Sequence, residues 1–166
     1  MKANRLYTLL FLMGCVGVAE GQDVFLDVNG FSKHSQETFV YQGQQKTFNR
    51  NNAGLGVTAA LSKHIDLKVG FYDNSYFHTT VYSGVNVKTE FSFGQMKFVP
   101  GVTVGLATGY DNTPMHSGLF QLYVIPNIGI RLGSVGVTVG YIPGVSLASD
   151  SAPVSVVTAQ FQYQIK

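Results

Sequence analysis

Apolar and polar residues alternate along most of this chain with a period of two. In segment 65–72, for example, Ile65, Leu67, Val69 and Phe71 fall on one face. This alternation predicts β-strands, because successive side chains of a strand point to opposite faces of a sheet. No stretch beyond the first 21 residues shows the helical period, so the sequence predicts an all-β fold.

The alternation divides the chain into eight strands of similar length. They are expected at residues 23–31, 53–61, 65–72, 79–90, 97–108, 119–132, 135–141 and 154–165. Short turns alternate with the longer polar segments 32–52, 110–118 and 143–152, as in small outer-membrane barrels. We therefore expect an eight-stranded antiparallel transmembrane β-barrel. The alternatives are a secreted β-sandwich and a lipocalin-like barrel.

The composition favours the membrane barrel over the secreted alternatives. Only 12% of the residues are charged, which is about half the share in a typical soluble domain. An eight-stranded barrel is too narrow for a general pore. A net charge of +2 without a cluster of Lys and Arg gives no indication of nucleic acid as a partner. The expected partners are membrane lipids, and we expect a monomer.

The first 21 residues are typical of a secretory signal peptide. Lys2 and Arg5 precede the apolar segment 6–18, and a small-x-small cleavage motif follows at 19–21. The sequence thus predicts export, a barrel domain over residues 22–166 and a location in the bacterial outer membrane. In the alternative interpretation, Cys15 ends a lipobox and becomes the lipidated N-terminus.

Candidate chemistry is concentrated between the third and fourth predicted strands. Asp73, Asn74, Ser75 and His78 bring a carboxylate, an amide, a hydroxyl and an imidazole together within segment 70–78. Asp, Asn and Ser are also common turn residues, so a purely structural role is the alternative. The chain has no nucleophile-elbow motif, no Cys/His metal motif and no phosphate-binding loop, so we expect no cofactor and no metal.

Several short segments resemble the lipid A palmitoyltransferase family (PagP) in their order and spacing. They are Phe-Asn-Arg at 48–50, Ala-Gly-Leu-Gly at 53–56, segment 70–84, and Tyr-Ile-Pro-Gly at 141–144 after Pro126. The chain is equally similar to a looser group of PagP-like bacterial and phage barrels of unassigned role. The resemblance implies a membrane barrel and transfer of an acyl chain from a phospholipid to lipid A.

The resemblance also implies a catalytic set of residues. His34 takes the place of the family's histidine, as the base that activates a lipid A hydroxyl, and Ser75 takes the place of its serine. Asn74 stands where the family has aspartate, and Asp73 comes one residue earlier. An amide can orient a group by hydrogen bonding, but it does not act as a carboxylate base.

Two further positions of the family concern lipid access. Pro126 and Pro143 resemble a pair at an opening between strands, where proline removes a backbone donor. At the second opening Asn52 replaces proline, and Asn86 replaces a glycine that sets acyl length in the family. Asn86 would be costly against a hydrocarbon chain unless it is hydrogen-bonded.

Two non-catalytic functions are the alternatives to an enzyme. The protein could bind a lipid or act structurally, or it could present the loops 32–52 and 110–118 to a partner. An apolar cavity open sideways near Pro126 and Pro143 would favour the enzyme and the lipid-binding barrel over a barrel that only presents loops. A side-chain contact between His34 and Ser75 would favour the enzyme over the lipid-binding barrel. Five tyrosines are expected in the outer aromatic girdle: Tyr72, Tyr76, Tyr82, Tyr110 and Tyr123.

Overall fold

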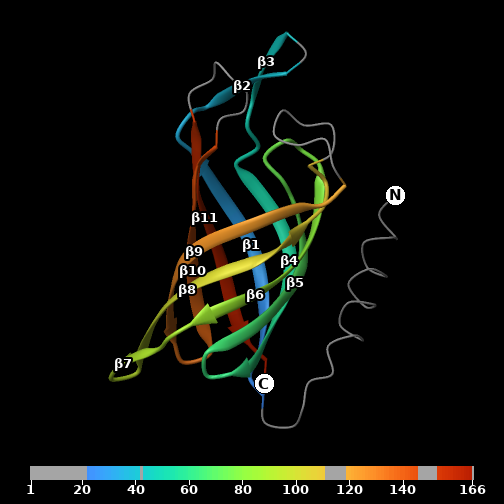
Figure 1. Ribbon diagram of the computed structural model, residues 1–166. Coiled ribbons are helices and arrows are strands. Elements are labelled where there is room, and N and C mark those ends of the chain that lie inside the picture. The colour runs from blue at the N-terminus through green and yellow to red at the C-terminus, as the bar shows by residue number, and fades with distance from the viewer. Residues whose placement is uncertain (1–21, 42, 111–118, 146–152, 166) are drawn as a thin grey trace.

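Eight long strands close into an antiparallel barrel in the computed structural model, which describes residues 22–41, 43–110, 119–145 and 153–165 (Figure 1). Each strand pairs with the next in space, β6 pairs with β8, and β1 pairs with β11 to complete the circle. These strands are β1 (Val24–His34), β4 (Asn51–Ser62), β5 (Ile65–Asp73), β6 (Thr79–Lys88), β8 (Met96–Ala107), β9 (Gln121–Leu132), β10 (Val135–Val145) and β11 (Val154–Gln164). The predicted all-β, eight-stranded barrel is confirmed. No helix among the described residues is long and apolar enough to cross a membrane.

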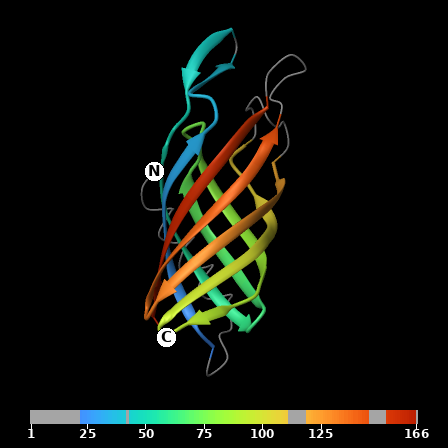
Figure 2. The ribbon, with the colours of Figure 1, turned by 90° about the vertical axis from the view of Figure 1, so that its left-hand side faces the viewer.

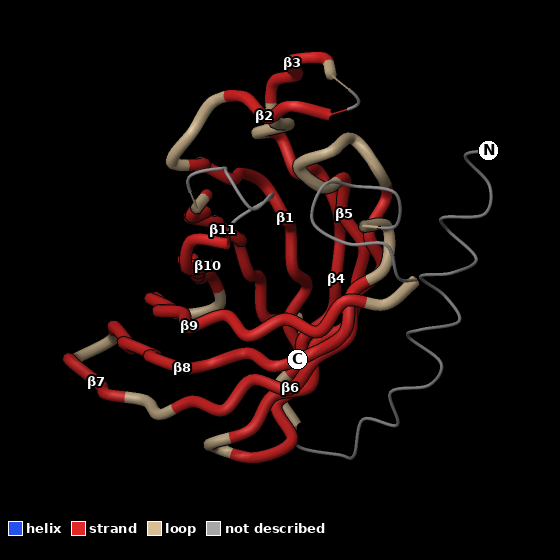
Figure 3. The backbone as a smooth tube through the Cα atoms, turned by 45° about the horizontal axis from the view of Figure 1, so that its top comes forward, coloured by secondary structure: helices blue, strands red, loops and turns tan. Residues whose placement is uncertain are grey.

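Three short strands extend the barrel at its two ends. Strands β2 (Thr38–Tyr41) and β3 (Gln44–Thr47) form a hairpin beyond one end, and β7 (Phe91–Phe93) pairs with the beginning of β8 at the other (Figures 1 and 3). The prediction of a loop over 32–52 was wrong. β1 continues to His34. The β-forming residues of β2 are followed by a turn at Gly43, whose φ is +73°, and the chain reverses its direction there.

The predicted end of the seventh strand was also wrong, because β10 continues through Pro143 to Val145. Beyond Gly140, β10 pairs with β11 but not with β9. Proline is tolerated at such an edge because the missing N–H leaves no ladder bond unmade. Residues 111–118 and 146–152 of the two predicted loops lie outside the described residues.

Polar side chains fill the interior of the barrel and apolar side chains cover its exterior. The buried polar residues include Asp27, Thr58, Asp66, Asn86, Lys88, Thr103, Arg131 and Gln162. The exposed apolar residues include Val28, Phe31, Val85, Val104, Leu122, Val124, Ile130, Val139, Val157 and Phe161. Figure 2 shows the tilted strands that form the wall of the barrel. This distribution is the reverse of that in a soluble barrel.

One end of the interior is filled by a polar network. Asn86 donates to Asp66 Oδ2 at 3.2 Å and accepts from Thr103 and Asn127, each at 3.1 Å. Lys88 Nζ forms an ion pair with Asp66 Oδ1 at 2.7 Å. Asn86 is therefore hydrogen-bonded in the interior.

The wall of the barrel has a gap in its backbone pairing between β9 and β10. Their ladder ends at the pair Asn127–Gly140, whereas β9 remains paired with β8 as far as Gln121. Residues 121–126 of β9 and 141–145 of β10 therefore have no ladder between them. Pro126 is the first residue of β9 beyond the ladder, so the gap lies where Pro126 and Pro143 were expected to mark an opening.

Candidate functional site

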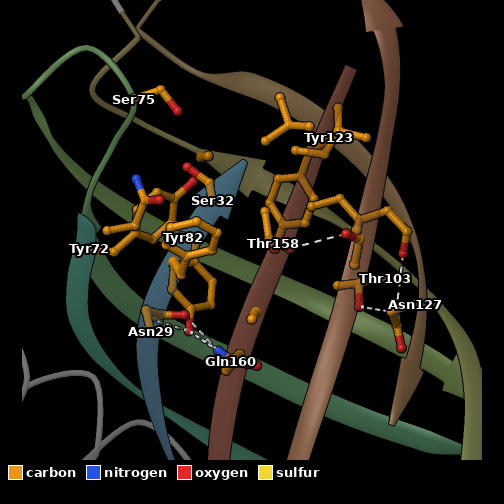
Figure 4. Close-up of a pocket in the computed structure, with 18 of the residues that line it drawn as sticks. Asn29, Ser32, Tyr72, Ser75, Tyr82, Thr103, Tyr123, Asn127, Thr158 and Gln160 are labelled. Atoms are coloured by element: carbon orange, nitrogen blue, oxygen red, sulfur yellow. Dashed lines mark hydrogen bonds between the residues drawn. The ribbon is translucent and has the colours of Figure 1, made fainter. Parts of the chain in front are cut away.

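A cavity of about 350 Å³ occupies the end of the barrel nearer the β2–β3 hairpin (Figure 4). Its lining is mostly aromatic and aliphatic, and it reaches the gap between β9 and β10. Leu122 and Val124 of β9 and Ile142 and Pro143 of β10 all line it. A cavity of this kind, apolar with a few polar groups, is the usual form of a ligand site.

The five tyrosines predicted for an outer girdle all line this cavity instead. Tyr72 and Tyr82 project inward from β5 and β6, and their ring centroids lie 5.8 Å apart. Glycine makes room for them: a Cβ on Gly70 would lie 2.7 Å from Tyr82 Oη, and Gly56 offers similar space. The girdle prediction was wrong because the phenol oxygens of Tyr72, Tyr82, Tyr110 and Tyr123 find hydrogen-bond partners within the barrel.

A β-bulge in β1 brings His34 into the cavity. The pairing of β1 with both neighbours shifts at Gly30, between Asn29 and Phe31. Before the bulge Asn29 faces inward, and beyond it Phe31 is exposed while Ser32 and His34 are buried in the lining. Without the extra residue, strict alternation would place His34 on the outer face.

His34 and Ser75 meet at the mouth of the cavity. His34 Nε2 lies 2.8 Å from Ser75 Oγ, which is within the range for a base and a nucleophilic hydroxyl. The imidazole also stacks on Phe48, with ring centroids 4.2 Å apart and an angle of 3° between the planes. Two of the predicted site residues, 41 positions apart in the sequence, are therefore in direct contact.

Asn74 shapes the loop that presents Ser75. Its side chain is fully buried, and its amide nitrogen donates to Gly109 O at 2.7 Å and to Thr80 Oγ1 at 3.1 Å. Its Oδ1 accepts the backbone N–H groups of Tyr76 and His78. Both donors and both lone pairs are occupied, so Asn74 is a positioning residue and does not contact the base.

Asp73 does not join the site. It belongs to the outward-facing set of β5, and its carboxylate accepts a hydrogen bond from Thr79 Oγ1 at 3.3 Å. His78 is exposed, and His64 lies in the turn between β4 and β5 at the opposite end of the barrel. His116 lies outside the described residues. The contact at the site is thus a dyad of His34 and Ser75.

Among the described residues, no carboxylate contacts the histidine of the dyad. His34 Nδ1 is buried and finds no hydrogen-bond partner among the described residues. Burial lowers the pKa of His34 to about 4, with a smaller contribution from the charge of Arg50. Along β1, the last apolar residue on the outer face is Phe31, and the next outward residue is the exposed Lys33. His34 follows Lys33 and therefore lies past the apolar part of the strand. At neutral pH the imidazole is uncharged and able to accept a proton.

This lowered pKa predicts an unusual pH dependence. Since the pKa of His34 is below its ordinary value of 6.5, the unfolded chain binds this proton more readily than the folded protein. Stability contributed by the neutral imidazole is therefore lost as the pH falls from about 6.5 towards 4. Comparing acid unfolding of the wild type with His34→Asn should show a smaller loss for the variant over this window. Equal losses would contradict the burial of a neutral His34.

Phe48 is expected to hold the imidazole in place of a carboxylate. Phe48→Ala should lower the rate of any reaction at Ser75 by about 2- to 10-fold, because the stacking contact is worth about 0.5–1.5 kcal/mol. Phe48→Tyr should restore most of the rate, since its ring can stack in the same way. If Phe48→Ala reacts as fast as the wild type, the stack does not orient the base.

The sequence of this chain matches no protein-family model and no curated protein. The architecture defines the protein as a closed eight-stranded antiparallel β-barrel with a gap in the pairing of β9 and β10 and a mostly apolar cavity at one end.

Proposed function

We propose that this protein is a bacterial outer-membrane barrel that transfers an acyl chain from a phospholipid to a hydroxyl of lipid A. The membrane location is supported by the apolar exterior and the polar interior of the barrel, which suit a lipid solvent. Closure also leaves no unpaired sheet edge around most of the wall, as a lipid environment requires.

The gap between β9 and β10 gives a lipid chain a sideways route to the site. Leu122 and Val124 are exposed on the outer face and also line the cavity. An acyl chain could therefore pass between β9 and β10 without crossing a closed ladder. No such route adjoins Asn52, because β1 and β4 remain paired up to Asn51 and Asn52 donates to Asp73 O at 2.8 Å.

The observation that carries the proposal is the 2.8 Å contact between His34 Nε2 and Ser75 Oγ at the cavity mouth. Ser75 Oγ attacks the ester carbonyl of the phospholipid while His34 takes the hydroxyl proton. The bond to the glycerol oxygen breaks, and the lysophospholipid leaves with that proton. A lipid A hydroxyl then gives its proton to His34 and attacks the acyl group on Ser75. Ser75 Oγ leaves and regains the proton.

The proposal is tested by mass spectrometry of lipid A from cells that have a lipid A acceptor. Cells expressing the protein should contain lipid A with an added acyl mass, and cells expressing His34→Ala should not. The exposed His78 offers a matched control in the same region, so His78→Ala should retain the added mass. Unchanged lipid A, with the folded barrel present in the outer membrane, would count against the transfer.

A non-catalytic lipid-binding barrel is the second candidate. It is favoured by the buried His34 Nδ1, which has no partner among the described residues, since catalytic histidines are usually oriented by a third group. In that case the cavity and the gap would serve binding alone. The two candidates are separated by turnover, because only the first releases a lysophospholipid.

A further inference from the structure

An unpaired cation lies at the inner end of the cavity. Lys68 of β5 lines the cavity and donates from Nζ to Gln160 Oε1 at 2.7 Å. Within the described part of the chain Lys68 forms no ion pair, and no Asp or Glu is among the residues that line the cavity. A charge in an apolar cavity is costly unless it is paired, so the cavity is complementary to an anion.

A second donor lies beside Lys68. Tyr82 Oη accepts from Asn29 Nδ2 at 3.5 Å and from Gln160 Nε2 at 3.4 Å. The phenol hydrogen itself has no acceptor among the described residues. Lys68 Nζ and Tyr82 Oη contact the oxygen and the nitrogen of the same side-chain amide, that of Gln160. The contacts of Tyr82 and Asn29 with Gln160 are drawn in Figure 4.

We propose that the cavity binds a slim amphiphile that carries one carboxylate, such as a free fatty acid. The carboxylate accepts hydrogen bonds from Lys68 Nζ and Tyr82 Oη at the inner end, where charge-assisted bonds are strongest. The hydrocarbon tail lies against Tyr123 and Ile125 and points towards the gap between β9 and β10. This binding does not depend on turnover at the dyad.

A buried carboxylate near Lys68 favours a ligand whose head group carries one negative charge over one that carries two. Asp27 is fully buried beyond the cavity lining, and its carboxylate accepts from Thr58 Oγ1 at 2.6 Å and from Gln162 Nε2 at 2.8 Å. It interacts electrostatically with Tyr82. A doubly charged phosphate monoester at Lys68 would meet this repulsion with only one cation to offset it. A carboxylate is therefore the better match.

The test compares ligands that differ only in their head group. Full-length protein, refolded in a neutral detergent and freed of lipid, is titrated with dodecanoic acid, methyl dodecanoate or dodecyl phosphate and followed by native mass spectrometry. At mildly alkaline pH the acid should bind about 10- to 100-fold more tightly than its methyl ester. It should also bind more tightly than the phosphate.

Variants assign the preference to Lys68. Lys68→Met should bind acid and ester alike, whereas Lys68→Arg should keep the preference for the acid. Lys33→Met removes a lysine from the outer face of β1 and should behave as the wild type. The titration contains no phospholipid donor and no lipid A, so a failure of acyl transfer in the test of the proposed function would leave this result unchanged.

Three outcomes would overturn the proposal. They are equal binding of acid and ester by the wild type, an undiminished preference in folded Lys68→Met, and tighter binding of dodecyl phosphate than of the acid. Circular dichroism establishes that each variant is folded before its binding is compared.

Discussion

Lys88→Met is expected to lower the free energy of unfolding by about 3–5 kcal/mol, because it leaves a buried carboxylate without its cation. Lys88 and Asp66 lie 2.7 Å apart, and each side chain is only 2% exposed. Once Lys88 is removed, Asp66 keeps the hydrogen bond from Asn86 at 3.2 Å and loses its ion pair. The measurement is equilibrium unfolding in urea from lipid vesicles, followed by circular dichroism because the chain contains no tryptophan.

Two further variants separate the buried ion pair from surface charge. Lys97 forms an ion pair with Glu90 at 3.3 Å, but the Lys97 side chain is 49% exposed. Lys97→Met should therefore lower the free energy of unfolding by less than about 1 kcal/mol. Adding Asp66→Asn to Lys88→Met removes the uncompensated charge and should recover most of the lost stability. A loss below about 1 kcal/mol for Lys88→Met alone would show that Asp66 is not left buried and charged.

His34→Ala and Ser75→Ala are each expected to slow acyl transfer by about 10²- to 10⁴-fold, because the first removes the general base and the second removes the nucleophile that it activates. The two side chains act as a unit through their 2.8 Å contact, so the double variant should be no slower than either single variant. The measurement is the initial rate of lysophospholipid release by purified protein, and both variants should keep the circular dichroism spectrum of the wild type.

Controls for this prediction come from the same region of the barrel. His78 is exposed, so His78→Ala should retain at least half of the wild-type rate. Asn74→Ala should lower the rate as well, but together with stability, because it frees four hydrogen-bonding groups in a buried site. If effects of His34→Ala and Ser75→Ala multiply in the double variant, the two residues do not form one catalytic unit.

The strands and their closure into a barrel could be predicted because alternation is a local signal. On β6, Val81, Val85 and Val87 fall on one face and Tyr82 and Lys88 on the other. The same pattern already placed Tyr82 with the polar, interior set. The girdle prediction was wrong because it relied on the chemical character of tyrosine instead of its position in the alternation.

The candidate site was only partly predictable. The resemblance assigned His34 and Ser75 to one catalytic set, but their contact depends on the bulge at Gly30, and a single glycine in a strand does not specify a bulge. The structural role of Asn74 could not be inferred, since its partners Thr80 and Gly109 are brought near by folding. Lys68 was missed for a related reason: Gln160 lies 92 residues away in the sequence.

Measuring acyl transfer by the purified barrel is the most direct test of the proposed function. Vesicles containing lipid A and a phospholipid with one carbon-13-labelled acyl chain are incubated with wild-type protein or His34→Ala, and all lipids are analysed by mass spectrometry. The wild type is expected to produce labelled lipid A and lysophospholipid in equal amounts, and the variant is expected to produce neither. If the folded wild type produces neither lipid, or if His34→Ala produces both at the wild-type rate, the site at His34 and Ser75 does not transfer acyl chains to lipid A.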